Sequence, residues 1–113
     1  MSSYAFLGPS GTFTEAALLG ITTGEDTRTP LSNVTATLDA VRNGLAEFAL
    51  VPIENSVEGV VARTLDELAT GEALEIVAET TIPVSFALMT LPENAARKIT
   101  KVATHPHAES QCR

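Results

Sequence analysis

The chain has 113 residues, 44% of them hydrophobic, and 14 acidic residues against 7 basic ones give it a formal net charge of -7. This composition predicts a packed domain and argues against a disordered chain. The basic residues are scattered, which argues against a nucleic-acid-binding protein. The sequence contains no window of about 18 apolar residues, the length needed to span a membrane.

The N-terminus and the cysteine content narrow the expected compartment. The first residues, MSSYAFLGPSG, lack a basic region and carry an apolar run too short for a signal peptide, so we expect a cytoplasmic protein. Cys112 is the single cysteine, which leaves no internal disulfide, and no Cys/His spacing suggests a metal site. We interpret Cys112 as a small reduced side chain rather than as a catalytic nucleophile.

The N-terminal residues predict a strand, a turn and a helix. Residues 4–7 form a short apolar run that turns at residues 8–11, and a helix follows as far as Gly20. Thr12 and Glu15 have the spacing of a capping box, in which Glu15 reaches back to the amide of Thr12.

The alternation of strand and helix continues along the chain. Residues 27–31 predict an extended segment, and Ser32 and Asn33 are plausible caps for the helix that follows. That helix carries apolar residues at i, i+4 and i+7 on one face and ends at Gly44.

A second buried strand is predicted after this helix. Residues 48–53 are apolar without alternation, which is typical of a strand buried on both faces of a parallel sheet, and Pro52 marks its end. A polar turn at residues 54–59 and a short helix over residues 64–69, closed by Gly71, come next.

The pattern changes in the last third of the chain. Residues 74–82 alternate between apolar and polar, which predicts a long, half-exposed strand that crosses into a second lobe. Residues 84–91 and 101–104 predict further strands, with a helical turn at residues 92–98 between them and a helix that starts at Pro106.

This order of elements predicts an α/β fold. Residues 1–75 are expected to form a first α/β lobe, and residues 76–113 a crossover strand and the incomplete start of a second lobe. The last helix has no stop signal before Arg113, so we expect the chain to be a fragment of a larger protein.

Polar groups follow three of the predicted strands, at the positions where open parallel sheets bind ligands. The first group is the turn Gly8–Thr12, where backbone amides and the hydroxyls of Ser10 and Thr12 could cradle an anion near a helix N-terminus. By itself this turn is more typical of a tight turn with a helix cap. It also lacks the lysine of a phosphate-binding P-loop.

The second and third groups are richer in polar side chains. Glu54, Asn55 and Ser56 follow a fully apolar strand, and although Asn and Ser also serve in turns, the succession slightly favours a functional site. Thr104 and His105 precede the last helix, with Gln111 one to two turns on. A histidine at this position is more often a cap than an acid or a base, and the local spacing gives no Ser-His-Asp or Cys-His arrangement.

Taken together, three stretches of the chain resemble the prephenate dehydratase family: FLGPSGTFTEAA (6–17), ALVPIENSVEGVVARTLDEL (49–68) and THPHAESQCR (104–113). The resemblance covers essentially the whole chain. It implies two α/β lobes of the type II periplasmic-binding-protein kind, here with the first lobe nearly complete and the second truncated, and the substrate between them. The family's Thr-Arg-Phe motif, which supplies a catalytic threonine, lies beyond residue 113, and a phenylalanine-binding ACT domain commonly follows.

The resemblance also implies an activity. The family are lyases that convert prephenate, a dianion, to phenylpyruvate, water and carbon dioxide in phenylalanine biosynthesis, and no cofactor is needed because aromatisation drives the reaction. Asn55, Thr104 and Gln111 correspond to catalytic positions of the family. Further residues expected to line the substrate cleft are Ser10, Thr12, Glu54, Ser56 and His105. His107 replaces the usual glutamine of the family. We interpret this change as one that tunes the properties of the cleft, and not as the addition of a proton donor.

Three further expectations concern the behaviour of the chain. The alternative to an enzyme is a non-catalytic module that binds a small carboxylate, as a solute receptor does. The 113-residue chain is expected to be inactive alone, because it lacks one wall of the cleft. It is also expected to form a homo-oligomer, by pairing or exchange of second-lobe elements, because those strands would have unpaired edges.

Overall fold

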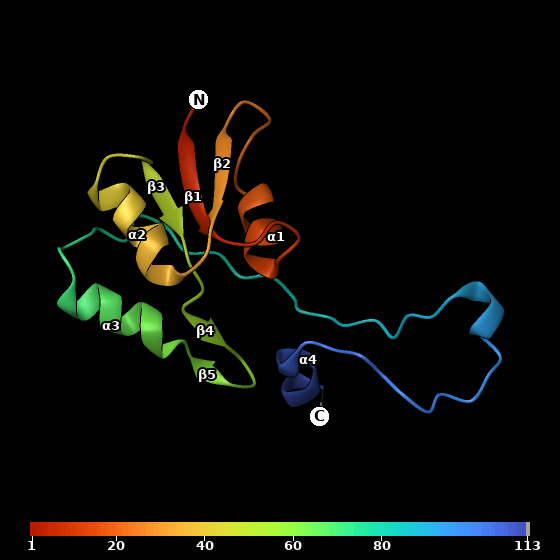
Figure 1. Cartoon of the computed structure of the whole chain (residues 1–113). Coiled ribbons are helices and arrows are strands. Elements are labelled where there is room, and N and C mark those ends of the chain that lie inside the picture. Colours follow the sequence, from red (N-terminus) through yellow and green to blue (C-terminus); the bar gives the residue numbers. More distant parts are fainter. Residues whose placement is uncertain (113) are drawn as a thin grey trace. The chain divides into compact units, whose positions relative to one another are not determined.

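The computed structural model describes residues 1–112 and divides the chain into two compact units, residues 1–82 and the residues from Pro83 onward. The first unit is a mixed α/β structure with a parallel sheet, and the second contains two short helical segments (Figure 1). No helix among the described residues is long and apolar enough to cross a membrane.

The sheet of the first unit has three parallel strands. β1 (Ser3–Leu7) lies between β2 (Thr27–Leu31) and β3 (Phe48–Leu50). Successive residues of a strand point to opposite faces of the sheet, and Ala5 and Phe6 are each only 1% exposed. The central strand is therefore covered on both faces.

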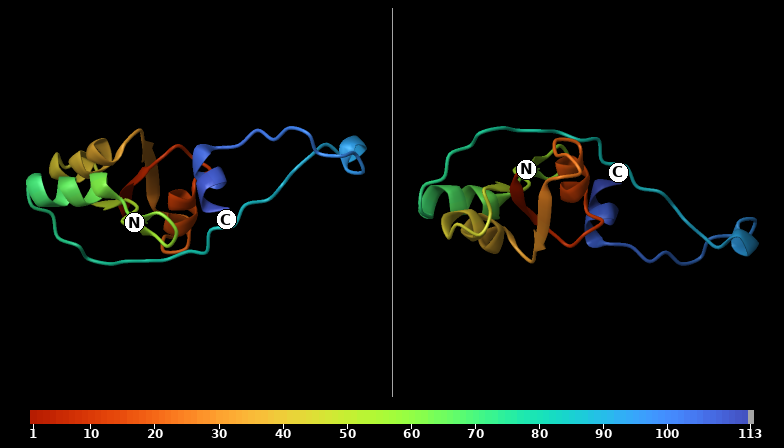
Figure 2. Two further views of the ribbon diagram at one scale, coloured as in Figure 1. Left: turned by 90° about the horizontal axis from the view of Figure 1, so that it is seen from below. Right: turned by 90° about the horizontal axis from the view of Figure 1, so that it is seen from above.

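Two helices connect the strands and cover these faces. α1 (Phe13–Leu19) follows β1, and α2 (Val34–Arg42) follows β2. The chain moves from β1 outward to β2 and then back past β1 to β3, so right-handed crossovers place α1 and α2 on opposite faces of the sheet. Figures 1 and 2 show this arrangement, with α3 (Ala62–Thr70) packed beside α2.

The structure confirms the elements predicted for residues 4–50, with one change at the first cap. Thr12 Oγ1 accepts a hydrogen bond from the Glu15 amide (3.3 Å), as a capping box requires. The Glu15 carboxylate, however, accepts from the amide of Gly11 (3.0 Å) rather than from that of Thr12. Gly11 precedes the N-cap, so this bond stabilises the turn before the helix rather than one of the helix's own first amides.

The prediction that the strand over residues 48–53 is buried on both faces was wrong. β3 is only three residues long and lies at the edge of the sheet, where Phe48 is 37% exposed. Its ring stacks on that of Tyr4, with centroids 5.2 Å apart. An unbroken apolar run does not distinguish a central strand from an edge strand that packs against a neighbour in this way.

The strands predicted over residues 74–82, 84–91 and 101–104 were also wrong, because none of these residues is part of a strand in the structure. The alternating pattern indicates which side of a strand would be buried, but strand hydrogen bonds require a neighbouring strand. Ile76 and Val77 are equally exposed, at 67% each, so the alternation of residues 74–82 has no buried side.

The two helical segments of the second unit agree with the sequence. η1 (Pro92–Asn94) is a single turn, and α4 (Pro106–Gln111) begins with the proline expected at a first helical position. The proposed lobe boundary at residue 75 stays a prediction.

Candidate functional site

The turn after β1 is held tightly against β2. The amide of Gly8 donates to the carbonyl oxygen of Leu31 (2.8 Å), and a Cβ at position 8 would lie 2.8 Å from the Cβ of Pro30. Only glycine allows the backbone at position 8 to approach residues 30 and 31 so closely. The turn therefore starts from a defined position at the carboxyl ends of β1 and β2.

The polar side chains of this turn differ in what they contact. Thr12 Oγ1 accepts from the Glu15 amide and donates to the Leu7 carbonyl oxygen (3.4 Å), so its hydroxyl is engaged in the turn. Ser10 is exposed and lines an open hollow of about 390 Å³. The other residues lining this hollow are Pro9, Pro30, Leu31 and Ser32. The cap interpretation thus describes Thr12, whereas Ser10 faces a space that a ligand can enter.

Asn55 lies in a hairpin that continues from the end of β3. β4 (Glu54–Asn55) pairs in antiparallel fashion with β5 (Gly59–Val60), and Asn55 is opposite Gly59, whose φ of 86° is readily adopted by glycine. Asn55 Oδ1 accepts from the amides of Val57 (2.9 Å) and Glu58 (3.2 Å). The carbonyl end of this amide thus holds the turn, and the hydrogen-bond donors of the side chain are at its Nδ2 end.

The neighbours of Asn55, Glu54 and Ser56, are both exposed. The structure brings these two side chains into the same hairpin as Asn55, as their succession in the sequence requires. They are thus accessible to a ligand that approaches the hairpin.

A buried hydroxyl closes the base of the hairpin. Thr64 in the first turn of α3 is 1% exposed, and its Oγ1 donates to the carbonyl oxygen of Pro52 (2.7 Å). Next to it, the amide of Val61 donates to the carbonyl oxygen of Ile53 (2.9 Å). These bonds join the chain entering the hairpin to the chain leaving it.

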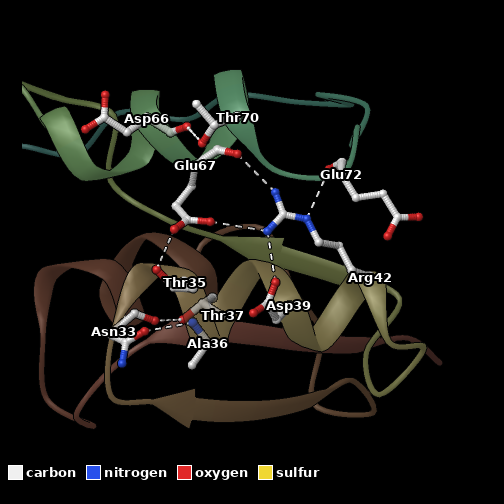
Figure 3. A network of polar contacts seen from close by, with 10 residues as sticks. All are labelled: Asn33, Thr35, Ala36, Thr37, Asp39, Arg42, Asp66, Glu67, Thr70 and Glu72. Carbon is white, nitrogen blue, oxygen red and sulfur yellow. Dashed lines mark hydrogen bonds and ion pairs between the residues drawn. The ribbon is translucent and has the colours of Figure 1, made fainter.

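The far end of α3 is held on α2 by Arg42, whose side chain is 7% exposed (Figure 3). Its guanidinium contacts Asp39 Oδ1 (2.9 Å) and Glu67 Oε2 (3.3 Å), and it donates to the carbonyl oxygens of Glu67 (3.1 Å) and Glu72 (3.0 Å). Hydrogen bonding to Asp39 first, and then to Glu67, raises the pKa of Arg42 above its ordinary value. The other oxygen of Glu67 accepts from Thr35 Oγ1 (2.7 Å).

Neither Thr64, which bonds to the segment before the hairpin, nor Arg42, which joins α2 to α3, was singled out from the sequence. Asp39 and Arg42 are three residues apart on a helix, so their contact was detectable from spacing. Glu67 and Pro52, in contrast, are distant in sequence from their partners. The packing of α3 on α2 brings Glu67 to Arg42, and the position of α3 beside the segment after β3 brings Thr64 to Pro52.

In the second unit, Thr104 and His105 are exposed and form the start of α4. Thr104 Oγ1 donates to the carbonyl oxygen of His105 (3.2 Å), and His105 Nδ1 accepts from the amide of His107 (3.1 Å). The two imidazole rings meet edge to face with centroids 4.6 Å apart. His105 is therefore the cap of this helix, and Gln111 lies at its other end.

Two of the three predicted groups thus follow strands of one parallel sheet. β1 and β3 are adjacent and parallel, so their carboxyl ends lie at the same end of the sheet. The turn Gly8–Thr12 follows β1 there, and the chain that leads to the hairpin with Asn55 follows β3 (Figure 1). Thr104, His105 and Gln111 belong to the second unit. That all three groups share one crevice stays a prediction. Among the described residues, no group of three or more His, Cys, Asp or Glu side chains is arranged to hold a metal ion.

Comparison with known proteins gives a consistent result. A family model described as prephenate dehydratase matches residues 4–113. The prephenate dehydratase of Mycobacterium ulcerans is 46% identical over 122 residues, covering 100% of this chain and 39% of that protein. That of Mycobacterium leprae strain TN is 49% identical over 118 residues, covering 96% of this chain and 37% of that protein. The chain spans about two fifths of the length of these relatives.

Solved structures agree with the sequence relatives. The crystal structure of prephenate dehydratase from Arthrobacter aurescens in complex with L-Phe is 54% identical, with a TM-score of 0.65, and the match covers 73% of this chain and 27% of that chain. The X-ray structure of prephenate dehydratase from Streptococcus mutans is 37% identical, with a TM-score of 0.70, over 74% of this chain and 44% of that chain.

Proposed function

The chain belongs to the prephenate dehydratase family, and from that premise we propose that the protein carrying it converts prephenate to phenylpyruvate, water and carbon dioxide. The reaction removes the ring hydroxyl and the ring carboxylate together, which makes it a lyase step. The observation that supports this proposal most directly is the hairpin with Asn55, which follows the carboxyl end of β3 just as the turn Gly8–Thr12 follows the carboxyl end of the adjacent parallel strand β1.

The chemistry requires hydrogen-bond donors more than a strong acid or base. Aromatisation of the ring supplies the driving force, so the protein has to bind a dianion and stabilise the departing hydroxyl. In our proposal the Asn55 amide donates to that hydroxyl or to a substrate carboxylate, and Thr104 and Gln111 are the other catalytic residues. Removal of one well-placed donor of this kind typically costs about 10² to 10³ in rate.

The proposal extends to fold and binding residues. Residues 1–75 constitute the first lobe of a type II periplasmic-binding-protein-like fold, and residues 76–113 begin the second lobe. Ser10 and Ser56 contribute hydroxyls that bind the substrate, and the side chains of Thr12, Glu54 and His105 line the same site. We assign the protein to the cytoplasm.

A graft tests whether this chain supplies the residues required. Residues 1–113 replace the matching segment of the Mycobacterium marinum prephenate dehydratase, which is 46% identical over the whole of this chain. We expect the grafted protein to form phenylpyruvate from prephenate, and Asn55→Ala to lower kcat by about 10² to 10³. Thr23→Ala, on an exposed residue outside the proposed site, is the control and should retain activity.

The same assay distinguishes an enzyme from a binding module. A grafted protein that folds and binds prephenate, as measured by calorimetry, but does not form phenylpyruvate would support the solute-binding alternative. The 113-residue chain alone is expected to form no detectable phenylpyruvate, since it does not contain the Thr-Arg-Phe sequence whose threonine the family uses.

We further propose that the 113-residue chain self-associates. The second unit has large apolar side chains that are exposed, namely Val84, Phe86, Leu88, Met89, Leu91, Ile99 and Val102. Burial of apolar surface favours association by about 25 cal/mol per Å², so a second copy would be stabilised by covering them. Light scattering at micromolar concentration is expected to give at least the mass of a dimer, and a monomer would contradict this.

A further inference from the structure

We propose that Thr64 is a positioning residue for Asn55, an inference that rests on the proposed function of Asn55 as a hydrogen-bond donor to the substrate. Thr64 does not reach the substrate itself in this proposal. It determines where the hairpin with Asn55 lies relative to the sheet.

The hairpin is too small to hold its own position. β4 and β5 have two residues each, and hairpins much longer than this are only marginally stable in water. The turn between them is organised by Asn55 Oδ1, which shapes the loop but does not attach it to the sheet. The attachment has to come from the base of the hairpin.

At that base, Thr64 provides a buried link to the end of the sheet. Its Oγ1 donates to the carbonyl oxygen of Pro52 over 2.7 Å, and the side chain is 1% exposed. The cap residue of α3, Val61, has no side-chain bond to the helix, and its amide instead donates to Ile53. The start of α3 is thus joined to the chain that leads into the hairpin.

The helix that carries Thr64 is itself fixed by contacts independent of the hairpin. Arg42 on α2 binds the carboxylate and the carbonyl oxygen of Glu67, and Thr35 on α2 donates to the same carboxylate (Figure 3). Because α2 packs on the sheet, α3 is a stable reference point. Through its hydrogen bond, Thr64 fixes the carbonyl group of Pro52 relative to α3, and Pro52 is three residues before Asn55.

Loss of the Thr64 hydroxyl leaves the carbonyl oxygen of Pro52 without this buried donor and frees the base of the hairpin to shift. A catalytic group displaced by about 1 Å can lose about 10² in rate. The effect should appear in kcat, because it concerns the alignment of Asn55 with the reacting group rather than the binding of the remaining substrate.

The test uses the complete natural polypeptide that carries residues 1–113, with prephenate as substrate. Thr64→Val keeps the shape of the side chain and removes the hydroxyl, and we expect kcat to fall about 10- to 100-fold with little change in KM. Thr64→Ser keeps the hydroxyl and should restore most of the activity. The matched control is Thr70→Val, because Thr70 Oγ1 also donates to a carbonyl oxygen over 2.7 Å on the same helix, but that oxygen belongs to Asp66 of α3.

A double-mutant cycle distinguishes positioning from general destabilisation. If Thr64 acts through Asn55, then Thr64→Val added to Asn55→Ala should lower kcat little further, because the donor to be positioned is already gone. Full additivity of the two losses overturns the inference, as does an equal loss in Thr70→Val. If the starting protein forms no phenylpyruvate, the proposed function fails instead, and the two failures are distinguishable.

Stability is measured for each variant by thermal unfolding. If Thr64→Val fails to fold, the inference is tested by comparing the kcat of Thr64→Ser with that of Thr64→Cys. The thiol is a much weaker donor than the hydroxyl and is of nearly the same size. The inference requires lower kcat for the cysteine variant, and equal kcat for the two variants contradicts it.

Discussion

The first unit contains a set of buried apolar side chains, whereas no side chain in the described part of the second unit is buried. Leu18 on α1 is 0% exposed, but Leu88 in the second unit is 68% exposed. Both leucines lie in segments that are rich in apolar residues. The difference is in what surrounds them.

Strand partners account for this difference. β1 has a parallel neighbour on each side and a helix on each face, so its hydrogen bonds and its side chains are satisfied together. Residues 84–91 belong to no strand and follow an extended path (Figure 1). Apolar patterning therefore produces a core only where a neighbouring strand and a covering helix are also present.

The largest expected effect is a difference in the free energy of unfolding between alanine variants of these two leucines. Leu18→Ala creates a cavity in the core and should lower the free energy of unfolding by about 2 to 5 kcal/mol. Leu88→Ala removes the same atoms from an exposed position and should change it by less than about 0.5 kcal/mol. Urea unfolding followed by circular dichroism measures both, and similar losses for the two variants would show that the second unit has a core of its own.

The next effect concerns the polar contacts between α2 and α3 in the first unit. Arg42→Met removes a charged donor that is 7% exposed and leaves the Glu67 carboxylate without its cationic partner. We expect a loss of about 2 to 3 kcal/mol in the free energy of unfolding. Arg63→Met, an exposed arginine of α3, is the control and should cost less than about 0.5 kcal/mol. Equal costs would mean that the Arg42 contacts contribute no more than those of a surface charge.

The same contrast explains what the sequence could predict. The strand and helix positions over residues 4–50 follow from local signals, such as the cap at Thr12, the cap at Asn33 and the glycine stops. The strands predicted at the end of the first unit, residues 74–82, and in the second unit, residues 84–91 and 101–104, were wrong because pairing is not a local property. β3 was misjudged as fully buried for a related reason, since the order of strands in a sheet decides which one lies at the edge.

The candidate site shows the same limit. Asn55 and its neighbours were recognised from their position after an apolar strand, and the structure places them in a hairpin there. The contacts that hold this hairpin, from Thr64 to Pro52 and from Arg42 to Glu67, join residues that no helical or strand period relates. They depend on how α3 packs against α2 and against the segment after β3, which local patterning does not contain.

A smaller effect on stability is expected when a helix cap of each unit is removed. Asn33 Oδ1 accepts from the Ala36 amide (2.7 Å) at the start of α2, and Asn33→Ala should lower the free energy of unfolding by about 1 kcal/mol. His105→Ala removes the corresponding bond of α4, a six-residue helix far below the length of about 12 to 15 residues needed for independent stability. We expect no change in the urea midpoint but faster hydrogen exchange at the Cys112 amide, which donates to Ala108. A lowered midpoint for His105→Ala would indicate that α4 unfolds together with the first unit.

The smallest effect is the contribution of a half-buried carboxylate at the N-terminal end of the sheet. The amide of Thr23 and then that of Ser2, each 2.8 Å from a carboxylate oxygen, lower the pKa of Asp26 below its ordinary value of 3.8. Folding therefore favours the charged form, so the stabilisation is complete above pH 3.8 and is lost as the pH falls through the lower folded pKa. The difference in melting temperature between the wild type and Asp26→Asn should shrink across this acid range, with Asp66→Asn on the exposed surface of α3 as background. A constant difference down to the lowest pH would show that these bonds do not depend on the charge, and that the first unit owes its acid sensitivity to other groups.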